Sequence, residues 1–202
     1  NLVNAKLDGL NLENANLDGA NLESATLIGA NLENATLNGA NLENANLEGA
    51  NLRKARLLKA ILINSNLKKT YIFGASFEDS ILKKSKFNES SSGDDNSEDY
   101  EHYFGAYFVR TDLSEVDFTD AILAGSEFLS SNLYKANFTR ADLNRASFHS
   151  ANLKEANLTD ANVKNLSIHD AILCNTQTPW GIDNTGCKKK FRLNINTKYE
   201  EI

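Results

Sequence analysis

The 202-residue chain contains no methionine, one proline, one tryptophan and two cysteines. No stretch approaches the roughly 20 consecutive apolar residues that a membrane-spanning helix requires, so membrane insertion is not expected. No apolar segment led by Lys or Arg opens the sequence, so no signal peptide is expected within it. Two cysteines are too few for a disulfide framework, and Cys174 and Cys187 could form one bond or be two unrelated thiols.

Basic residues are not in excess either. The chain has 21 Lys and Arg and 27 Asp and Glu, so its formal net charge is −6. This balance argues against a nucleic-acid binder of the basic-patch kind, and no nucleic-acid partner is expected. The charge is uneven, because residues 1–52 are acidic, residues 53–87 are basic and residues 88–103 are acidic again. Both signs recur at short intervals, which favours a solvated repeat surface over an electrostatic binding face.

A five-residue repeat dominates the sequence, as in the stretch NLENANLEGANL at residues 41–52. Leu, Ile or Phe stands at every fifth position from Leu2 to Phe87, and a shifted series runs from Phe108 to Leu173. A small residue usually precedes each of these centres by two positions. Neither the 3.6-residue period of a helix nor the two-residue period of a strand would gather the centres on one face. A chain that turns a corner every five residues would direct all the centres towards one interior. The repeat therefore predicts a solenoid with the centres inside.

A second period of ten residues indicates the number of sides. Glycine recurs every ten residues from Gly9 to Gly49, and phenylalanine does so from Phe108 to Phe148. A four-sided coil keeps such residues in columns on two opposite sides, whereas a three-sided coil would scatter them. We therefore predict an all-β, square solenoid of about eight coils, with a corner of positive φ two residues after each centre. The expected core centres include Leu12, Leu32, Leu52, Phe77, Phe87, Phe108, Phe118, Phe128, Phe138 and Phe148.

The pattern Ala-Asn/Asp-Leu-x-x, as in Ala50-Asn51-Leu52 and at residues 141–143, resembles the pentapeptide-repeat protein family. The resemblance covers residues 1–87 and 104–173, and the dense NLENANLEGA style is similar to that of cyanobacterial members. It implies a right-handed quadrilateral β-helix, which agrees with the square coil expected from the two periods. It also fits a non-enzymatic structural or interaction protein, since most of those members have no assigned biochemical activity.

The acidic, Ser- and Gly-rich segment at residues 88–103 interrupts the repeat. Continuity of the phenylalanine columns requires one further side between Phe87 and Phe108, which favours an insertion of about 11 residues over one of about 16. We place that side at Tyr103 and the loop within residues 88–99. The loop could be a tolerated insertion or a partner-binding tag. The candidate interaction residues in it are Asp94, Asp95, Glu98, Asp99 and Tyr100.

This loop does not match a known metal site. Its acidic side chains are closely spaced, as in calcium-binding loops, but the full calcium-loop pattern is missing and no metal is expected there. His149 and His169 are 20 residues apart and should stack on adjacent coils about 5 Å apart, as a surface coincidence rather than half of a metal site. No catalytic or cofactor-binding constellation is recognisable, so neither an enzyme nor a cofactor is expected.

Residues 174–202 leave the repeat and are expected to cap the end of the solenoid, where unpaired strand groups would otherwise be exposed. The candidates for covering the core are the apolar side chains Trp180, Ile182, Phe191 and Leu193. The stretch CNTQTPWGIDNTGC resembles the Cys-flanked C-terminal segment of many cyanobacterial pentapeptide-repeat proteins. That resemblance implies a Cys174–Cys187 disulfide and favours the periplasm or thylakoid lumen, while free thiols would leave the cytoplasm open.

The leading hypothesis for function is a structural or interaction scaffold that contacts an unknown protein partner through the insertion loop or a flat face of the rod. The sequence leaves the oligomeric state open and favours a monomer. The alternative is an acidic rod that mimics DNA and binds DNA gyrase, as some pentapeptide-repeat proteins do. Ladders of acidic residues continuing down one face would favour the alternative. The basic stretch that follows residue 52 weighs against it.

Overall fold

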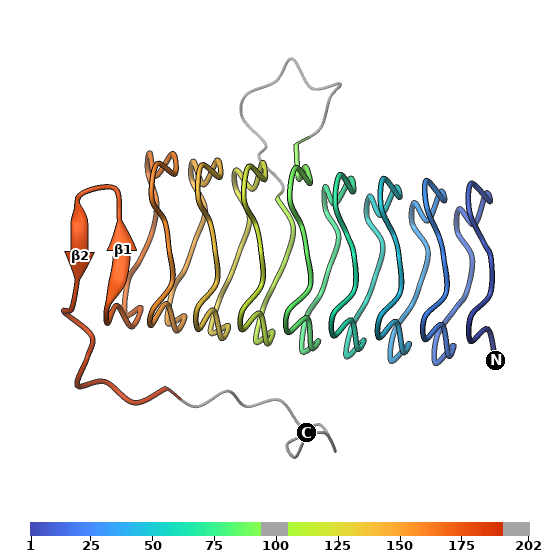
Figure 1. Cartoon of the computed structure of the whole chain (residues 1–202), viewed down its shortest axis with the longest axis horizontal. Coiled ribbons are helices and arrows are strands. Elements are labelled where there is room, and N and C mark those ends of the chain that lie inside the picture. Colours follow the sequence, from blue (N-terminus) through green and yellow to red (C-terminus); the bar gives the residue numbers. More distant parts are fainter. Residues whose placement is uncertain (94–104, 192–202) are drawn as a thin grey trace.

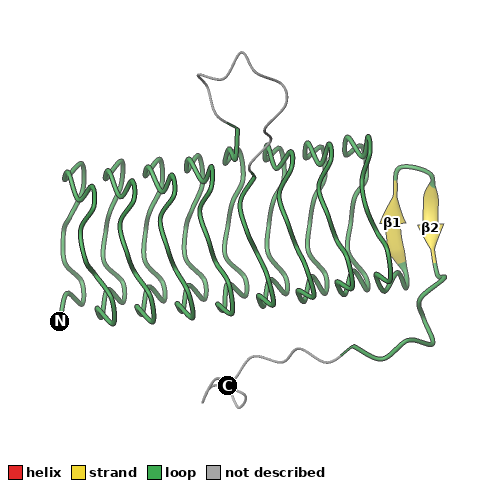
Figure 2. Cartoon of the chain, turned by 180° about the vertical axis from the view of Figure 1, so that it is seen from behind, coloured by secondary structure: helices red, strands yellow, loops and turns green. Residues whose placement is uncertain are grey.

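The computed structural model describes residues 1–93 and 105–191, which form one elongated solenoid (Figure 1). Parallel backbone bridges join residues 20 positions apart on both sides of the interruption, for example Asn11 with Asn31 and Asn132 with Asn152. Since a corner recurs every five residues, four sides complete each coil, in agreement with the sequence prediction. The N-terminus and the C-terminal hairpin lie at opposite ends of the rod (Figure 2).

Each corner places one residue in the left-handed region of backbone conformation. φ is +57° at Asn4 and +64° at Gly9, and the same conformation recurs two residues after nearly every centre. The corner is closed by a hydrogen bond, in which Ala5 N donates to Leu2 O over 3.0 Å. Glycine and asparagine were expected at these positions because they tolerate positive φ. Lys54, however, adopts it too, with a φ of +56°, so the stacked coils impose the corner on residues that disfavour it.

Backbone hydrogen bonds between coils repeat on every side. Leu22 N donates to Asn41 O over 2.7 Å, and Asn41 N donates in turn to Ala20 O over 2.9 Å. A third bond per side runs from the corner, as Ser24 N donates to Glu43 O over 2.9 Å. These bonds satisfy backbone groups that would otherwise need water. A coil therefore depends for its structure on the coils that flank it, as in other solenoids.

The interior is filled by the predicted centres. Every centre named above from Leu32 onward is fully buried, whereas Leu12 belongs to the first coil and is only partly buried. On one side of the rod the rings of Phe108 and Phe128 stack with centroids 4.9 Å apart, and on the opposite side those of Phe118 and Phe138 stack at 5.1 Å. Both spacings are close to the distance between neighbouring strands, so each coil contributes one ring to each of the two columns.

Across the interruption the bridges join residues 31 positions apart, such as Ser76 with Tyr107 and Ile81 with Asp112. Compared with the regular spacing of 20, the insertion adds 11 residues, which is the length that the phenylalanine columns predicted. The ring of Phe77 stacks directly on that of Phe108, with centroids 5.0 Å apart.

The extra side does not lie where the sequence analysis placed it. Ser91 bridges both Tyr71 and Ile122, so the side is centred on buried Ser92, and residues 88–92 belong to the solenoid rather than to the loop. Tyr103 lies outside the described residues. Serine gave no apolar signal, but it is accommodated because its hydroxyl donates to Ile122 O over 3.1 Å and accepts from Ser126 Oγ over 3.2 Å.

The C-terminal end is an antiparallel hairpin of β1 (Thr176–Thr178) and β2 (Gly181–Asp183) (Figures 1 and 2). Gln177 bridges Asn157, so β1 continues the stack of sides with both of its threonines buried. Trp180 and Ile182, which were expected to cover the core, are 58% and 70% exposed. These two side chains do not cover the core because alternation along β1 directs its threonines inward, while Trp180 lies in the hairpin turn. Phe191 is partly buried, and Leu193 lies outside the described residues.

Replacing Phe118 by Ala should lower the free energy of unfolding by about 3–5 kcal/mol, because it removes a fully buried ring that stacks between Phe87 and Phe138. The control Phe73→Ala, at a position facing away from the core, should cost less than about 1 kcal/mol. Chemical denaturation followed by circular dichroism measures both changes. Equal losses in the two variants would contradict the packed phenylalanine columns.

Candidate interaction surfaces

The charged side chains of the described residues project from the outer faces of the rod. The polar groups that are buried inside are mostly hydroxyls bonded to nearby carbonyls, as where Ser65 Oγ donates to Leu62 O over 2.7 Å. No three or more His, Cys, Asp or Glu side chains in this part of the chain are grouped to hold a metal ion. Nor do the described residues include a helix with the length and apolarity that crossing a bilayer demands.

Columns of asparagine run along the faces at the position before each centre. Asn51 Nδ2 donates to Asn31 Oδ1, and Asn31 Nδ2 donates to Asn11 Oδ1, each over 3.0 Å. The same amide oxygens accept from the chain two residues on, as Glu33 N donates to Asn31 Oδ1 over 3.2 Å. The recurring Asn-Leu pair is therefore explained by coil stacking and turn formation, and these amides are not primarily recognition groups.

His149 and His169 stack on adjacent coils as predicted, with ring centroids 5.1 Å apart. His169 Nε2 also lies 3.2 Å from the carboxylate of Asp170. Among the described residues no further ligand joins the pair to form a metal centre. The third histidine, His102, lies outside the described residues.

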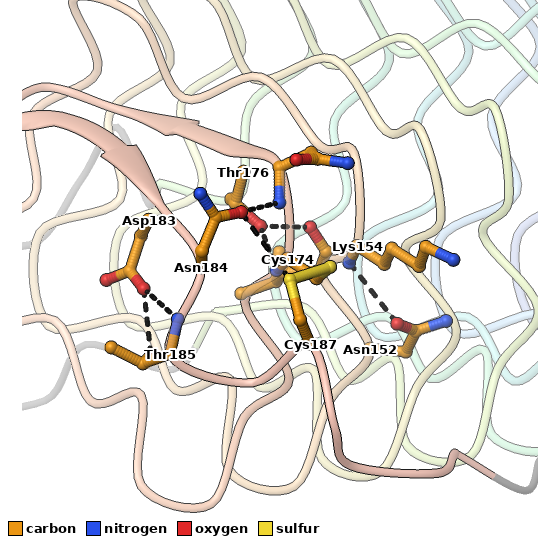
Figure 3. The surroundings of a disulfide bond; sticks show 10 residues. Asn152, Lys154, Cys174, Thr176, Asp183, Asn184, Thr185 and Cys187 are labelled. Atoms are coloured by element: carbon orange, nitrogen blue, oxygen red, sulfur yellow. Dashed lines mark hydrogen bonds between the residues drawn. A yellow bond between two sulfur atoms is a disulfide. The ribbon is translucent and has the colours of Figure 1, made fainter.

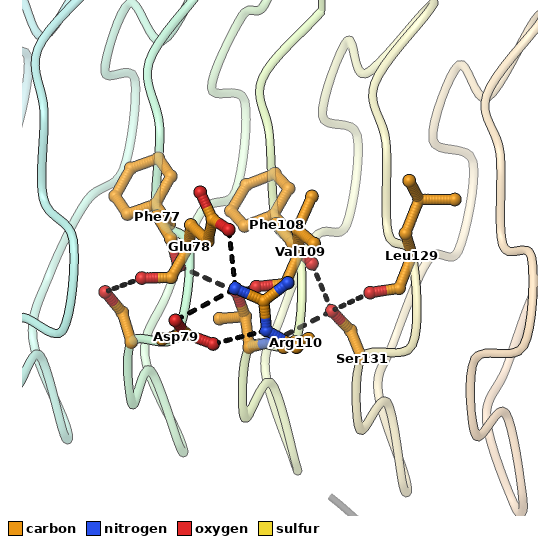
Figure 4. A network of polar contacts seen from close by, with 10 residues as sticks. Phe77, Glu78, Asp79, Phe108, Val109, Arg110, Leu129 and Ser131 are labelled. Atoms are coloured by element: carbon orange, nitrogen blue, oxygen red, sulfur yellow. Dashed lines mark hydrogen bonds and ion pairs between the residues drawn. The ribbon is translucent and has the colours of Figure 1, made fainter. Parts of the chain in front are cut away.

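An ion-pair cluster ties together the coils that precede and follow the insertion (Figure 4). Arg110 Nε donates to Asp79 Oδ1 over 2.7 Å, and Arg110 Nη2 donates to Asp79 Oδ2 over 3.0 Å and to Glu78 Oε1 over 2.5 Å. Hydrogen bonds from the guanidinium to Asp79, and then to Glu78, raise the pKa of Arg110. Forked guanidinium–carboxylate pairs are among the strongest ionic hydrogen bonds. This cluster could not be predicted from sequence spacing, because Asp79 and Arg110 become neighbours only once the 31-residue register is known.

A second cluster anchors the start of the segment that the sequence assigned to the loop. Asn88 Nδ2 donates to Asp117 Oδ2 over 2.6 Å, and Thr119 Oγ1 donates to Asp117 Oδ1 over 2.6 Å. Burial raises the pKa of Asp117, but the hydrogen bonds from Thr119 and Asn88 outweigh it and hold the pKa below its ordinary value. Asn88 is thus part of the wall of the rod.

The candidate interaction loop, comprising Asp94, Asp95, Glu98, Asp99 and Tyr100, lies outside the described residues. Its base is described and is tightly packed. A Cβ atom on Gly105 would lie 2.2 Å from the backbone nitrogen of Ser126, so only glycine fits this position. Ala106 N then donates to Ser126 Oγ over 3.1 Å, which returns the chain to its regular register.

The acidic ladders of residues 1–52 do not continue along any one face of the described rod. In the column one residue after the centres, Glu33 is followed on the next coil by Arg53. On another face, Glu43 is followed by Ile63 and then by Lys83. The surface therefore changes from acidic to basic along the rod, and the continuous acidic face expected of a DNA mimic is not formed by the described residues.

Cys174 and Cys187 are joined by a disulfide bond, with their Cα atoms 4.6 Å apart (Figure 3). This confirms the pairing that the resemblance implied. The bond lies where the chain returns from β2 onto the last coil, and there Gly186 N donates to Leu173 O over 2.7 Å. A Cβ atom on Gly186 would lie 2.6 Å from Leu173 N, so the disulfide holds together two segments in close backbone contact.

Replacing both cysteines by serine should lower the free energy of unfolding by about 3 kcal/mol at most, since the bond closes a short loop with a sequence separation of 13. Thermal denaturation with and without a reducing agent measures the effect. Reduction should destabilise the natural protein and leave the double serine variant unchanged. Titration of two free thiols in the unreduced, folded protein would contradict the disulfide.

The carboxylate of Asp117 should contribute to the pH dependence of stability. Its folded pKa is depressed, so its contribution is present above the unfolded pKa of about 4 and is lost as pH falls through the folded value. Asn88→Ala removes a donor to this carboxylate and should raise its pKa. Carboxyl titration by nuclear magnetic resonance checks both statements. Titration of Asp117 at or above the ordinary aspartate value in the natural protein would contradict them.

The model of the family described as pentapeptide repeats matches the chain in 8 copies, over residues 1–39, 30–68, 40–79, 111–149 and 141–176. No curated protein sequence is significantly similar to the chain. The solved structures that resemble it include HetL, a pentapeptide repeat protein involved in heterocyst differentiation regulation from the cyanobacterium Nostoc sp. strain PCC 7120. HetL is 23% identical, with 86% of this chain and 91% of HetL covered and a TM-score of 0.35.

Two further solved structures that resemble the chain are a plasmid-mediated protein and a plant protein. A trypsin-treated form of QnrB1, a plasmid-mediated fluoroquinolone resistance protein, is 19% identical, with 90% of this chain and 89% of QnrB1 covered and a TM-score of 0.46. A pentapeptide repeat protein from the Arabidopsis thaliana thylakoid lumen is 19% identical, with 72% of this chain and 69% of that chain covered and a TM-score of 0.23. At these identities and at TM-scores of 0.46 or lower, the likeness transfers no activity to this chain.

Proposed function

The chain belongs to the pentapeptide repeat family, and we propose that it is a non-enzymatic scaffold for protein interaction, built as a right-handed quadrilateral β-helix of about eight coils. The observation that carries the proposal is the filled interior. Fully buried columns of leucine and phenylalanine occupy the space inside the coils, with alanine beside them. Such a rod presents rigid, flat faces on which side chains recur at the coil spacing, rather than a deep pocket for a small substrate.

We place the partner contact at the insertion, in the candidate interaction loop. Its acidic charge suits a basic patch on a protein partner. The ion pairs of Arg110 with Asp79 and Glu78 support this assignment, because they stiffen the rod at the point where the insertion leaves it. The rod would then act as a mount that fixes the place and direction of the loop.

Deleting residues 94–104 tests the loop while preserving the rod. The insertion adds 11 residues and the deletion removes the same number, so the 20-residue register is restored. Gly105 would then take the corner position two residues after Ser92, where positive φ is required. Ala106 would keep the small, inward position two residues before Phe108. The variant should therefore unfold cooperatively, at a temperature within a few degrees of the natural protein.

Affinity capture from an extract of the source cells compares this deletion with the natural chain. A third form carries Asp94, Asp95, Glu98 and Asp99 replaced by their amides. A partner retained in stoichiometric amount by the natural chain and lost by both variants is the expected result. A partner held equally by all three forms would move the contact to a face of the rod. No partner held in stoichiometric amount by any form would count against the scaffold proposal.

A second candidate function is an acidic rod that mimics DNA and binds DNA gyrase. The net charge of −6 and the acidic residues of the first coils favour it, while the basic columns after residue 52 oppose it. A supercoiling assay with purified gyrase separates the candidates. Inhibition by the natural chain that is lost in Glu33→Lys would support mimicry, and unchanged supercoiling at micromolar protein would exclude it.

For the location we propose the periplasm or the thylakoid lumen, because disulfides such as Cys174–Cys187 persist in oxidising compartments. Fractionation of the source cells, with thiols trapped before lysis, tests this. Recovery of the protein in the cytoplasm with both thiols free would overturn the proposed location.

A further inference from the structure

One face of the rod carries an apolar groove between charges of opposite sign. Ile61 and Ile63 lie on its central coil, with Glu43 one coil nearer the N-terminus and Lys83 one coil nearer the C-terminus. The groove has a volume of about 260 Å³ and is completed by Asn41, Asn64 and Lys84. We call this the isoleucine face. Both isoleucines remain partly exposed to solvent although they flank a fully buried leucine.

Reversing the order of the outward side chains about Ile63 brings one pair of opposite charges together and no pair of like charges. In the column one residue after the centres, successive coils carry Val3, Glu23, Glu43, Ile63, Lys83, Ser114 and Tyr134. Counting outward from Ile63 in the two directions, acidic Glu43 corresponds to basic Lys83. The next pair combines Glu23 with a neutral serine, and the third combines an apolar valine with a tyrosine. No like charges coincide within this column.

We propose that two copies of the chain associate through the isoleucine face as an antiparallel dimer. A two-fold axis that lies in the interface and crosses the rods at Ile63 pairs each coil with the one equally far on the other side of Ile63. Ile63 then meets Ile63 of the second copy, and Glu43 meets Lys83 of the second copy at two symmetric places. Such an interface uses the same patch on both copies and closes on itself, so it forms a dimer rather than a fibre.

The charges of the groove are available for this contact. Glu43 and Lys83 take no part in the ion pairs found within residues 1–93 and 105–191. Lys84, at the corner, lies 4.0 Å from Glu115 and is directed along its own rod. A second copy would therefore give each of the two charges an opposite partner while covering the isoleucines. The proposed dimer does not rest on the proposed scaffold function. The sequence left the oligomeric state open and favoured a monomer.

Sedimentation equilibrium of the purified natural chain over a wide concentration range tests the proposal. We expect a reversible monomer–dimer equilibrium that weakens as salt screens the charges. Glu43→Lys places lysine opposite lysine twice and should raise the dissociation constant by about tenfold or more. Ile63→Glu brings two carboxylates together at the axis and should act in the same direction. The double variant Glu43→Lys with Lys83→Glu exchanges the charges and should return the constant to within about threefold of the natural value.

Glu33→Lys is the matched control, because Glu33 holds the corresponding position on a different face and its replacement should leave the constant unchanged. Recovery in the double variant would also show that the single change had not simply unfolded the chain. A natural chain that stays monomeric up to millimolar concentration would overturn the proposal. So would a dimer that is indifferent to Glu43→Lys, or one that the charge exchange fails to restore.

Discussion

The structure depends on one constraint, which is that the backbone turns a corner every five residues and bonds to the coil 20 residues away. Each corner requires one residue with positive φ, in the left-handed region of backbone conformation. Hydrogen bonds from neighbouring coils hold that residue in this conformation. Once this register is set, the inward positions are fixed and must be filled by groups of suitable size. Leucine, phenylalanine and alanine fill them at the coil spacing, so packing and hydrogen bonding reinforce the same geometry.

The regular parts of the rod could be predicted because each coil repeats the same packing requirement many times. The phenylalanine columns even gave the length of the insertion, since aromatic rings gain most by stacking on rings in the next coil. The side centred on Ser92 could not be recognised in the same way. The backbone register sets the inward position of Ser92. Its hydroxyl forms hydrogen bonds there, so the position is not marked in the sequence by an apolar residue.

The ends and the ion pairs were harder to predict for a related reason. At the C-terminal end, an apolar residue was expected to cover the core, yet β1 does so with threonines while Trp180 remains exposed. The contact of Arg110 with Asp79 depends on a register interrupted by the insertion, so sequence spacing alone concealed it. Interactions that occur once in a repeat protein have no periodicity that would reveal them in the sequence.

The outward positions of such a rod can determine which partner it binds, because core packing does not fix the residues that occupy them. At the position before each centre, asparagine forms ladders between coils and is explained by the fold rather than by a partner. The position after each centre carries charged or apolar residues on the isoleucine face, as at Glu43, Ile63 and Lys83, and stacking places them in line at the coil spacing. The order of residues along a column is then the pattern that a partner meets. A column whose order is complementary to its own reverse selects a second copy of the same chain in the opposite direction, whereas a column of one charge would select a different molecule.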